Sequence, residues 1–530
     1  MMKGRYRLGM LLGIGTLALL LAGCKDQSAE VSAPVLVADN KTITLTAQAS
    51  TLEVKDGVKL PVWTFNNQVP GPQIRAKVGD TINVTLKNEL DVPVSIHWHG
   101  YPVPNEMDGI PGVTQDAVVP GKTFTYTFKA TVPGTYWYHS HQDSVNQVDK
   151  GLYGTLIVED PKEKYDRDYT LVLDEWVSNG EVKESGNGME GMDHGNMDMS
   201  GTSEGGMEGM DHSQMGSDSM EGMDHGDQGE MPGMAGMDHD MSMYNLYTMN
   251  GKSGASIPAL EVKQGERVRV RFVNAGYIEH RMHLQGHDFK VIATDGQPIA
   301  SPASIRDQLL AIAPGERYDV EFTADQSGNV LIDEHGPDAR SDNMRVAIAY
   351  EGNKGKIAPS DAAEVFPVFD LTKYGKKRDA AAKLSLNTAF TQELTLRLNT
   401  AMQDGKMVYT INDKVFPNTD PIPVKSGDKV KVTLINESKT DDHPMHLHGH
   451  FFQVLSKDGK PVEGSDLVKD TLNLKPGEQY VVAFEADNPG EWMFHCHDLH
   501  HASAGMVTEV NYSDYKKAYV PDPNVGNMPE

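Results

Sequence analysis

Hydrophobic and polar residues alternate along three similar stretches of the chain. The sequence GDTINVTLKN at residues 79–88 recurs as GERVRVRFVN at 265–274 and as GDKVKVTLIN at 427–436. In the second copy, Val268, Val270 and Phe272 are separated by single arginines. This two-residue period is typical of a strand with one buried face, so each copy predicts a half-buried β-strand.

A second phrase repeats downstream of each of these strands. PGKTFTYTF begins at Pro120, PGERYDVEF at Pro314 and PGEQYVVAF at Pro476, and each precedes a Pro-Gly or Ser-Gly turn and another apolar strand. Strands and turns at such short spacing favour β-sandwiches over a helical arrangement. We predict an all-β chain of three Greek-key β-sandwich domains at residues 41–162, 163–362 and 363–515, with a linker at 24–40, an inter-domain connection at 370–385 and a tail at 516–530.

Residues 184–243 depart from this pattern. They contain 14 of the 27 methionines, four copies of Gly-Met-Asp-His and 14 acidic residues without Lys or Arg. Such a composition buries too little apolar surface to order a chain, so we predict a disordered insert in the second domain. Methionine thioethers are soft ligands suited to Cu(I), which favours copper capture over a plain linker. The net charge of −27, about half of it from this insert, argues against a nucleic-acid partner.

The N-terminus has the pattern of a signal peptide. Basic residues precede an apolar run of about 16 residues, which is too short for a comfortable membrane span. The ending Leu21-Ala22-Gly23-Cys24 resembles the bacterial lipoprotein box, which predicts a signal at residues 1–23, lipidation of Cys24 and an exported, membrane-anchored protein. An ordinary cleaved signal is the alternative. The second of the two cysteines, Cys496, would then be a free thiol in an exported protein, which suggests a metal ligand.

Histidines cluster at four places in the chain. The clusters are HWH at 97–99, HSH at 139–141, HPMHLH at 443–448 and HCH at 495–497, the last followed by His501 and Met506. Alternate side chains of a strand share a face, so each His-x-His pair can direct two imidazoles at one site. In the last cluster Cys496 points opposite to His495 and His497, so one strand can contact two metal sites.

The two sides of that strand differ in chemistry. Cys496, His501, Met506 and an incoming His443 form a thiolate, thioether and two-imidazole set typical of blue copper, whereas zinc rarely takes a thioether. The eight other histidines are too many for one ion and suit three coppers open to oxygen.

These motifs resemble those of the multicopper oxidases. HWHG, WYHSH, HPMHLHGH and HCHDLHHASAGM occur in that family's order, and the resemblance covers nearly the whole mature chain. It implies three cupredoxin-like domains and four coppers that couple one-electron oxidations to reduction of O2 to water. The implied ligands are His443, Cys496, His501 and Met506 for type 1 copper, His97 and His446 for type 2, and His99, His139 and His497 with His141, His448 and His495 for the type 3 pair.

The resemblance also suggests roles for other parts of the chain. Domains 1 and 3 must meet, and domain 2 becomes a spacer. Asp108 matches an acidic position near the oxygen side, where a carboxylate can relay protons, although a turn aspartate before glycine is an equal alternative. In domain 2, Gln285 stands at the position of His448 and Asp333 at that of His495. We therefore interpret the domain 2 histidines as structural remnants: His280, His283, His287 and His335. His450 and His500 stay unassigned.

The electron donor remains open at this level. Met-rich exported relatives include cuprous oxidases, although these carry the Met-rich segment in the third domain beside type 1 copper, whereas here it interrupts the second. Asp441 and Asp442 are candidate docking carboxylates, with a solvated turn as the alternative. The other hypotheses are a laccase-like oxidase of small phenols and a lipoprotein that buffers copper.

Overall fold

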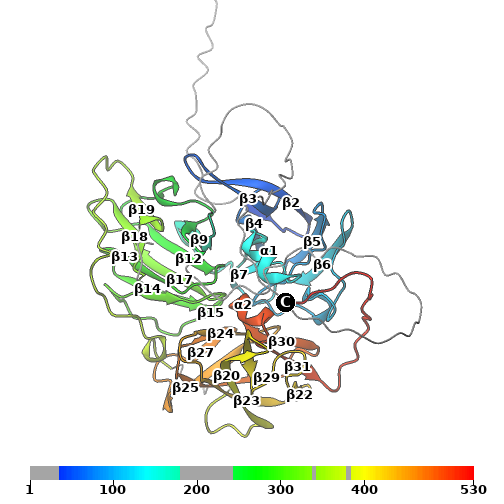
Figure 1. Cartoon of the computed structure of the whole chain (residues 1–530). Helices are drawn as coiled ribbons and strands as arrows, with labels where there is room; N and C mark the ends of the chain where they lie inside the picture. Colours follow the sequence, from blue (N-terminus) through cyan, green and yellow to red (C-terminus); the bar gives the residue numbers. More distant parts are fainter. Residues whose placement is uncertain (1–34, 179–242, 337–341, 378–383) are drawn as a thin grey trace, which may run out of the picture. The chain divides into compact units, whose positions relative to one another are not determined.

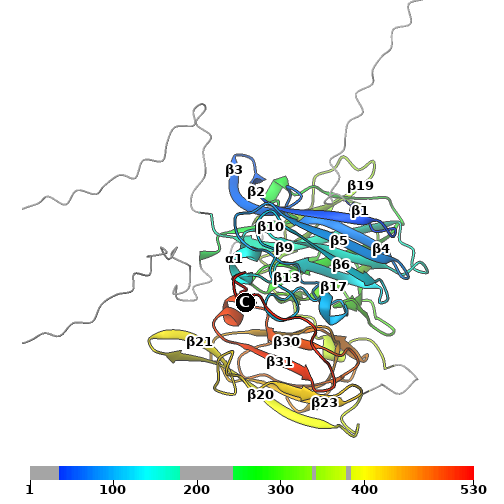
Figure 2. The same cartoon turned by 90° about the vertical axis from the view of Figure 1, so that its right-hand side faces the viewer.

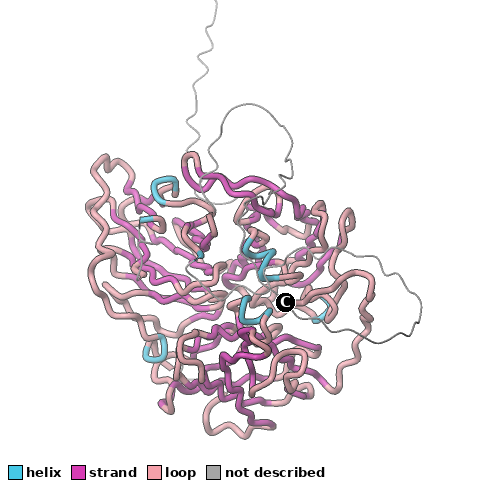
Figure 3. Tube along the Cα trace, in the orientation of Figure 1, coloured by secondary structure: helices cyan, strands magenta, loops and turns pink. Residues whose placement is uncertain are grey.

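Strands dominate the computed structural model, which describes residues 35–178, 243–336, 342–377 and 384–530 (Figures 1 and 3). Cys24 and residues 184–242 of the predicted insert lie outside these ranges. The described residues belong to one compact unit. Within the described part of the chain, none of the helices approaches the length and hydrophobicity needed to cross a membrane.

Domain 1 contains two four-stranded sheets. One has the order β1 (Val35–Val37), β4 (Gly71–Lys77), β8 (Tyr153–Glu159) and β7 (Gly134–His139), and the other β3 (Val58–Phe65), β2 (Thr42–Lys55), β5 (Thr81–Asn88) and β6 (Thr123–Lys129). The short helices η1 (Asn105–Met107) and α1 (Ser144–Asp149) lie in its loops.

Domain 2 has a six-stranded and a five-stranded sheet. The first is β10 (Leu246–Met249), β9 (Arg167–Trp176), β12 (Arg267–Asn274), β17 (Arg317–Thr323), β14 (Phe289–Thr294) and β15 (Gln297–Pro298). The second is β11 (Leu260–Val262), β19 (Arg345–Tyr350), β18 (Val330–Glu334), β13 (His280–Leu284) and β16 (Leu310–Ile312). Two short 3-10 turns described in full are η3 (Gly254–Ser256) and, in the connection to domain 3, η5 (Leu371–Lys373).

Domain 3 follows the same plan (Figure 2). One sheet contains β21 (Lys406–Ile411), β20 (Gln392–Gln403), β23 (Lys429–Asn436), β29 (Gln479–Glu485), β25 (Phe452–Lys457) and β26 (Lys460–Pro461), with β27 (Leu467–Lys469) paired to β25. The other contains β22 (Ile422–Val424), β31 (Val507–Tyr512), β30 (Glu491–Cys496), β24 (His443–Leu447) and β28 (Thr471–Leu474), and α2 (Leu499–Ser503) follows β30.

The two repeated phrases form neighbouring antiparallel strands in every domain. They pair as β5 with β6, β12 with β17, and β23 with β29, which confirms the strands expected from the alternation. The asparagine that ends the first phrase is buried in each copy, and its amide donates to two backbone carbonyls, as Asn436 does to Asp441 and Leu474. A buried amide satisfied in this way fixes the turn that follows the strand. In domain 3 that turn leads directly to β24 and its histidines.

Candidate metal centre

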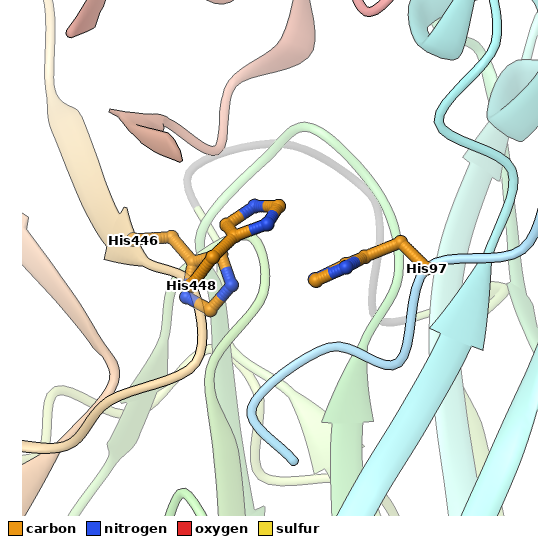
Figure 4. Close-up of side chains that lie close together, drawn as sticks. All are labelled: His97, His446 and His448. Carbon is orange, nitrogen blue, oxygen red and sulfur yellow. The ribbon is translucent and has the colours of Figure 1, made fainter. Parts of the chain in front are cut away.

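Eight buried histidines meet where domain 1 contacts domain 3. Their ligand nitrogens fall into groups that lie within 4.8 Å of one another, including His97 with His446 and His448, and His141 with His448 and His495. Figure 4 shows His97 directed at His446 and His448 from a different ribbon. The His97 ring stacks on His448 with centroids 3.9 Å apart, and the His99 ring stacks on His446 at 3.7 Å. The cluster is therefore made by both domains, as the histidine motifs require.

Strand pairing places these histidines, although several lie just beyond a strand end. His97 and His139 form an isolated antiparallel bridge with N to O distances of 2.8 and 3.1 Å. In domain 3, His446 is the direct partner of His495 where β24 pairs with β30. His141, His448 and His497 follow the ends of their strands, where the chain is free to turn its side chains towards the cluster.

Backbone carbonyls fix the orientation of most of these rings. The Nδ1 atoms of His97, His139, His446 and His495 lie 2.8–3.0 Å from carbonyl oxygens of Asp108, Ser140, Asp470 and Cys496. A carbonyl only accepts, so Nδ1 carries the hydrogen and Nε2 presents its lone pair to the cluster. His99 is reversed, because its Nε2 lies 3.3 Å from the Asp470 carboxylate and its Nδ1 faces inward.

The inward nitrogens meet the requirements of metal ligands. Among the described residues, Nε2 of His97, His139, His141 and His446 and Nδ1 of His99 are buried without a hydrogen-bond partner. The Nε2 atoms of His448 and His495 lie 2.9 Å apart, although both rings donate from Nδ1 to acceptors elsewhere. Two facing lone pairs repel unless a cation is shared between them. The donor set therefore fits copper.

Burial keeps these imidazoles neutral. It lowers the pKa of His141 to about 3, and it lowers the pKa of His139, His448 and His495 well below the usual value, assisted by neighbouring histidines. Neutral imidazole is the form that binds a metal, so the cluster is set to coordinate ions at physiological pH.

A second, smaller site lies on the other side of β30. The Sγ atom of Cys496 is 3.5 Å from Nδ1 of His501 and 3.9 Å from Nδ1 of His443, and these two nitrogens are 3.2 Å apart. The fourth predicted ligand, Met506, is buried, and its carbonyl accepts a hydrogen bond of 3.0 Å from the Cys496 amide. Burial raises the pKa of the Cys496 thiol well above its usual value. A bound cation is what stabilises a thiolate in such a place.

Asp108 connects the two domains at the larger cluster. It is 1% exposed, with one carboxylate oxygen 3.0 Å from Nδ1 of His448 and the other 3.2 Å from Nδ1 of His97. Asp108 also precedes a turn, since Gly109 has φ +82° and a Cβ there would lie 1.8 Å from the Ile96 carbonyl. The turn places the carboxylate, and the carboxylate orients one histidine from each domain.

Sequence reasoning missed two neighbours of the cluster. Asp470 holds His446 through its carbonyl and approaches His99 with its carboxylate, and it receives two hydrogen bonds of 2.6 and 2.7 Å from the buried Arg317 of domain 2. Domain 2 is thus more than a spacer. At the C-terminal end, the Pro529 carbonyl lies 2.5 Å from Nδ1 of His141 and Glu530 lies 3.6 Å from His495, next to α1 in Figures 1 and 2. Neither Asp470 nor the two C-terminal residues belong to a sequence motif. They reach the histidines only through contacts between segments far apart in the sequence, which a local pattern does not reveal.

The domain 2 histidines separate into two groups. His280 lies 3.2 Å from Glu175 and 3.7 Å from Glu334, and His287 lies 2.8 Å from the Tyr350 hydroxyl. His283 and His335 instead converge with Asp333 and Asp361. Of the unassigned histidines, His450 lies 2.6 Å from the Tyr512 hydroxyl, and His500 lies 3.0 Å from the Tyr244 hydroxyl.

Three cupredoxin-like sandwiches, with a Cys-His site joined by one His-Cys-His strand to an eight-histidine cluster, define a copper-dependent oxidase. Multicopper oxidase domain families match residues 46–163, 217–352 and 387–516. The chain belongs to the multicopper oxidase family. Its cofactor is copper, in type 1, type 2 and type 3 centres, and it is an oxidoreductase that uses O2 as electron acceptor.

Individual relatives agree with this assignment. Multicopper oxidase MmcO of Mycobacterium tuberculosis is 32% identical, over 89% of this chain and 87% of that protein. The copper resistance protein A homolog of Pseudomonas syringae pv. tomato is 25% identical, over 85% of this chain and 89% of its own length. The crystal structure of a multi-copper oxidase from Pseudomonas thermotolerans is 26% identical, with a TM-score of 0.61 over 91% of this chain and all of that one.

Proposed function

We propose that the protein is an exported cuprous oxidase that protects cells against copper. Four Cu(I) ions would each lose one electron, and one O2 with four protons would become two waters. Each substrate ion would leave as Cu(II) and its electron would pass to O2, so the reaction is balanced without another donor. Similarity to a copper resistance protein A homolog supports this choice of substrate.

We assign the four copper ions to the ligands that the motifs suggest. His443, Cys496, His501 and Met506 would hold type 1 copper, and the eight remaining histidines would hold the type 2 ion and the type 3 pair. When bound, these ions would supply electron acceptance at one site and oxygen reduction at the other. Cys496 lies between His495 and His497 in the chain, so the two sites are joined by adjacent residues.

An exposed methionine pair leads from the surface to the proposed type 1 ligands and supports Cu(I) as the donor. Met402 and Met407 are cross-strand partners on β20 and β21, with 67% and 38% of their surface exposed. The Met407 Sδ atom accepts a hydrogen bond of 3.2 Å from the Tyr409 hydroxyl, and the Tyr409 ring stacks on His501 at 3.9 Å. Two solvent-exposed thioethers are suited to capture a soft ion, and they are separated from His501 by one tyrosine.

The Met-rich segment rejoins the described chain close to this site. Tyr244, which follows Met243, bonds through its hydroxyl to His500 on α2 at 3.0 Å, and His501 is the next residue. This position supports delivery of Cu(I) by the insert. Asp442 is a weaker docking candidate, because Lys475 already lies 3.1 Å from its carboxylate. Asp441 likewise accepts a hydrogen bond of 2.5 Å from the Thr400 hydroxyl.

Other parts of the proposal rest on the sequence. Export and membrane attachment depend on residues 1–24 and on lipidation of Cys24, on the outer face of a bacterial cytoplasmic membrane or in the periplasm.

Asp108 would hold His97 and His448 in place and move protons towards the oxygen side. A laccase-like phenol oxidase and a copper-buffering lipoprotein are the competing functions.

The methionine pair provides the test. In the copper-loaded protein, the double variant Met402→Leu with Met407→Leu should lower kcat/KM for Cu(I) about tenfold, equivalent to ~1.4 kcal/mol, because the thioethers are lost while side-chain volume is kept. Oxidation of a small phenol should change less than about twofold. Cys496→Ser is the control, since it should abolish both activities together with the blue absorption.

The outcomes separate the three functions. Loss of Cu(I) oxidation alone supports the cuprous oxidase. Unchanged Cu(I) oxidation in the double variant, combined with stronger phenol turnover in the native protein, supports a laccase. Absence of turnover with either donor supports copper buffering.

A further inference from the structure

A second group of metal-ligating side chains lies in domain 2, outside the two sites described above. His283 in β13, Asp333 in β18, and His335 and Asp361 in the following loops have ligand atoms that all lie within 4.8 Å of one another. We call these four residues the middle-domain cluster. One Asp361 oxygen lies 3.3 Å from Nδ1 of His283 and 3.3 Å from Nε2 of His335, and an Asp333 oxygen lies 3.3 Å from the same His335 nitrogen.

The cluster is buried and held by neighbours that are not ligands. His283 and Asp333 are fully buried and His335 is 8% exposed, whereas the Asp361 side chain is 17% exposed. The Ser360 hydroxyl donates a hydrogen bond of 2.6 Å to the Asp333 carboxylate oxygen that does not contact His335. The Phe366 ring stacks on His283 with centroids 4.4 Å apart. These contacts fix the donor atoms as the surroundings of a metal site do.

Strand register places the middle-domain cluster at the position that the domain 3 histidines of the eight-histidine cluster occupy. His283 is the partner of Asp333 where β13 pairs with β18, and His446 is the partner of His495 where β24 pairs with β30. His335 follows Asp333 by two residues, as His497 follows His495. Domain 2 therefore keeps three donors at the equivalent positions, with a carboxylate in place of one imidazole.

Charge and donor type indicate the ion. Two carboxylates in a largely buried cluster require positive charge nearby, and one divalent cation would balance both. Two nitrogens and two oxygens suit Cu²⁺ or Zn²⁺, and the absence of sulfur from these four donors disfavours Cu(I). By the general affinity order of divalent ions, Cu²⁺ should bind more tightly than Zn²⁺.

We propose that the middle-domain cluster is a binding site for one divalent transition-metal ion, preferentially Cu²⁺, in addition to the family's copper centres. The position of Cys496 is occupied here by Glu334, so the site has no thiolate to receive electrons. It therefore binds the ion without turnover. The proposal does not depend on which donor the oxidase uses.

Metal content of the full-length, copper-loaded protein tests the proposal. The cluster variant carries Asp333→Asn and His335→Gln, and the matched control carries Asp288→Asn and His287→Gln, the same residue types in the same domain. After equilibration with CuSO4 and removal of loosely held ion, native and control proteins should each retain one more Cu²⁺ per chain than the cluster variant. Blue absorption should be equal in all three.

Thermal unfolding supplies a second measurement. In full-length protein loaded with only four equivalents of copper per chain, added ZnCl2 should raise the Tm of the native and control proteins but not that of the cluster variant, because an ion that binds only the folded state stabilises it. If the double variant does not fold, Asp361→Asn replaces it, since that side chain is partly exposed. Equal Cu²⁺ retention in all three proteins, or a Zn²⁺-dependent Tm shift that survives in the variant, would overturn the proposal and leave an ion-pair cluster.

Discussion

His280 shows how a change at one neighbouring residue alters the chemistry of a position. By strand register His280 matches the proposed type 1 ligand His443, but Glu334 stands where Cys496 would be. Glu334 and Glu175 approach the His280 ring from two sides, at 3.7 and 3.2 Å. Burial alone would lower the pKa of His280, yet its hydrogen bond to Glu175 and the negative charges of Glu175 and Glu334 raise it to about 9. A protonated imidazole, which cannot bind a metal ion, thus stands at the position of a type 1 ligand.

This shift predicts a pH-dependent contribution to stability. The folded-state pKa lies above the unfolded value of about 6.5, so His280 stabilises the fold fully below pH 6.5 and loses this effect as the pH rises through 9. The contribution is about 3 kcal/mol. The difference in unfolding free energy between the native protein and His280→Gln should therefore shrink between pH 6.5 and 10 in urea denaturation. His287→Gln is the control, because burial lowers the pKa of His287 and its effect should be constant over this range. A constant difference for His280→Gln would contradict the prediction.

At the scale of elements, β17 connects all three domains through its first residue. The Arg317 side chain donates from Nε to the Thr135 carbonyl of β7 at 3.2 Å and makes two hydrogen bonds to Asp470, between β27 and β28. Burial opposes ionisation of Asp470, but the Arg317 guanidinium holds the pKa of that carboxyl below its usual range. Asp470 in turn contacts His99 and His446. Strand β17 of domain 2 therefore helps to position the eight-histidine cluster, although it contributes no ligand to it.

Removing this arginine should damage one copper site selectively. Arg317→Met leaves a buried carboxylate without its partner, at a cost of about 3–5 kcal/mol, so Asp470 should protonate or move away from the histidines. We expect lower total copper with blue type 1 absorption retained. Arg271→Met is the matched control, because Arg271 is an equally buried arginine paired with Asp168 and Asp319 that contacts no proposed ligand. Equal copper loss in both variants, measured by elemental analysis, would show that general destabilisation is responsible.

At the scale of the whole molecule, the Met-rich insert leaves and re-enters between two paired strands. Leu246 of β10 is the direct partner of Trp176 of β9, and Ser178 donates from its amide to the Asn245 side chain at 3.0 Å. Ser178 and Asn245, described residues on either side of the insert, are therefore close enough for a short turn to join them. The sandwich does not require the 60-residue segment to close its sheet.

Replacing residues 184–243 with a short Gly-Asn turn should therefore preserve the copper sites while weakening the oxidation of Cu(I). We expect kcat/KM for Cu(I) to fall severalfold and that for a small phenol to stay unchanged at equal copper loading, because methionine binds Cu(I) in preference to Cu(II). An unchanged Cu(I) value would reduce the segment to a linker. Loss of both activities would indicate impaired folding instead.

The amino-acid sequence by itself determined the strands, the repeated plan and the donor atoms. Alternation with a period of two specifies a half-buried strand locally, and His-x-His and His-Cys-His spacing specifies donors by their chemistry. It also indicated, through matching phrases, that domain 2 is a diverged copy of domain 3.

Only the tertiary structure decided which distant residues act on those donors. The contact of Asp470 with His99 spans 371 residues of sequence, and that of Glu530 with His495 joins the chain end to β30. From the sequence we interpreted His283 and His335 as structural remnants. Asp361, which lies 3.3 Å from both, is brought next to them only by the fold. Local patterns carry no information about such contacts, since loop conformations and domain packing, rather than periodicity, bring these side chains together.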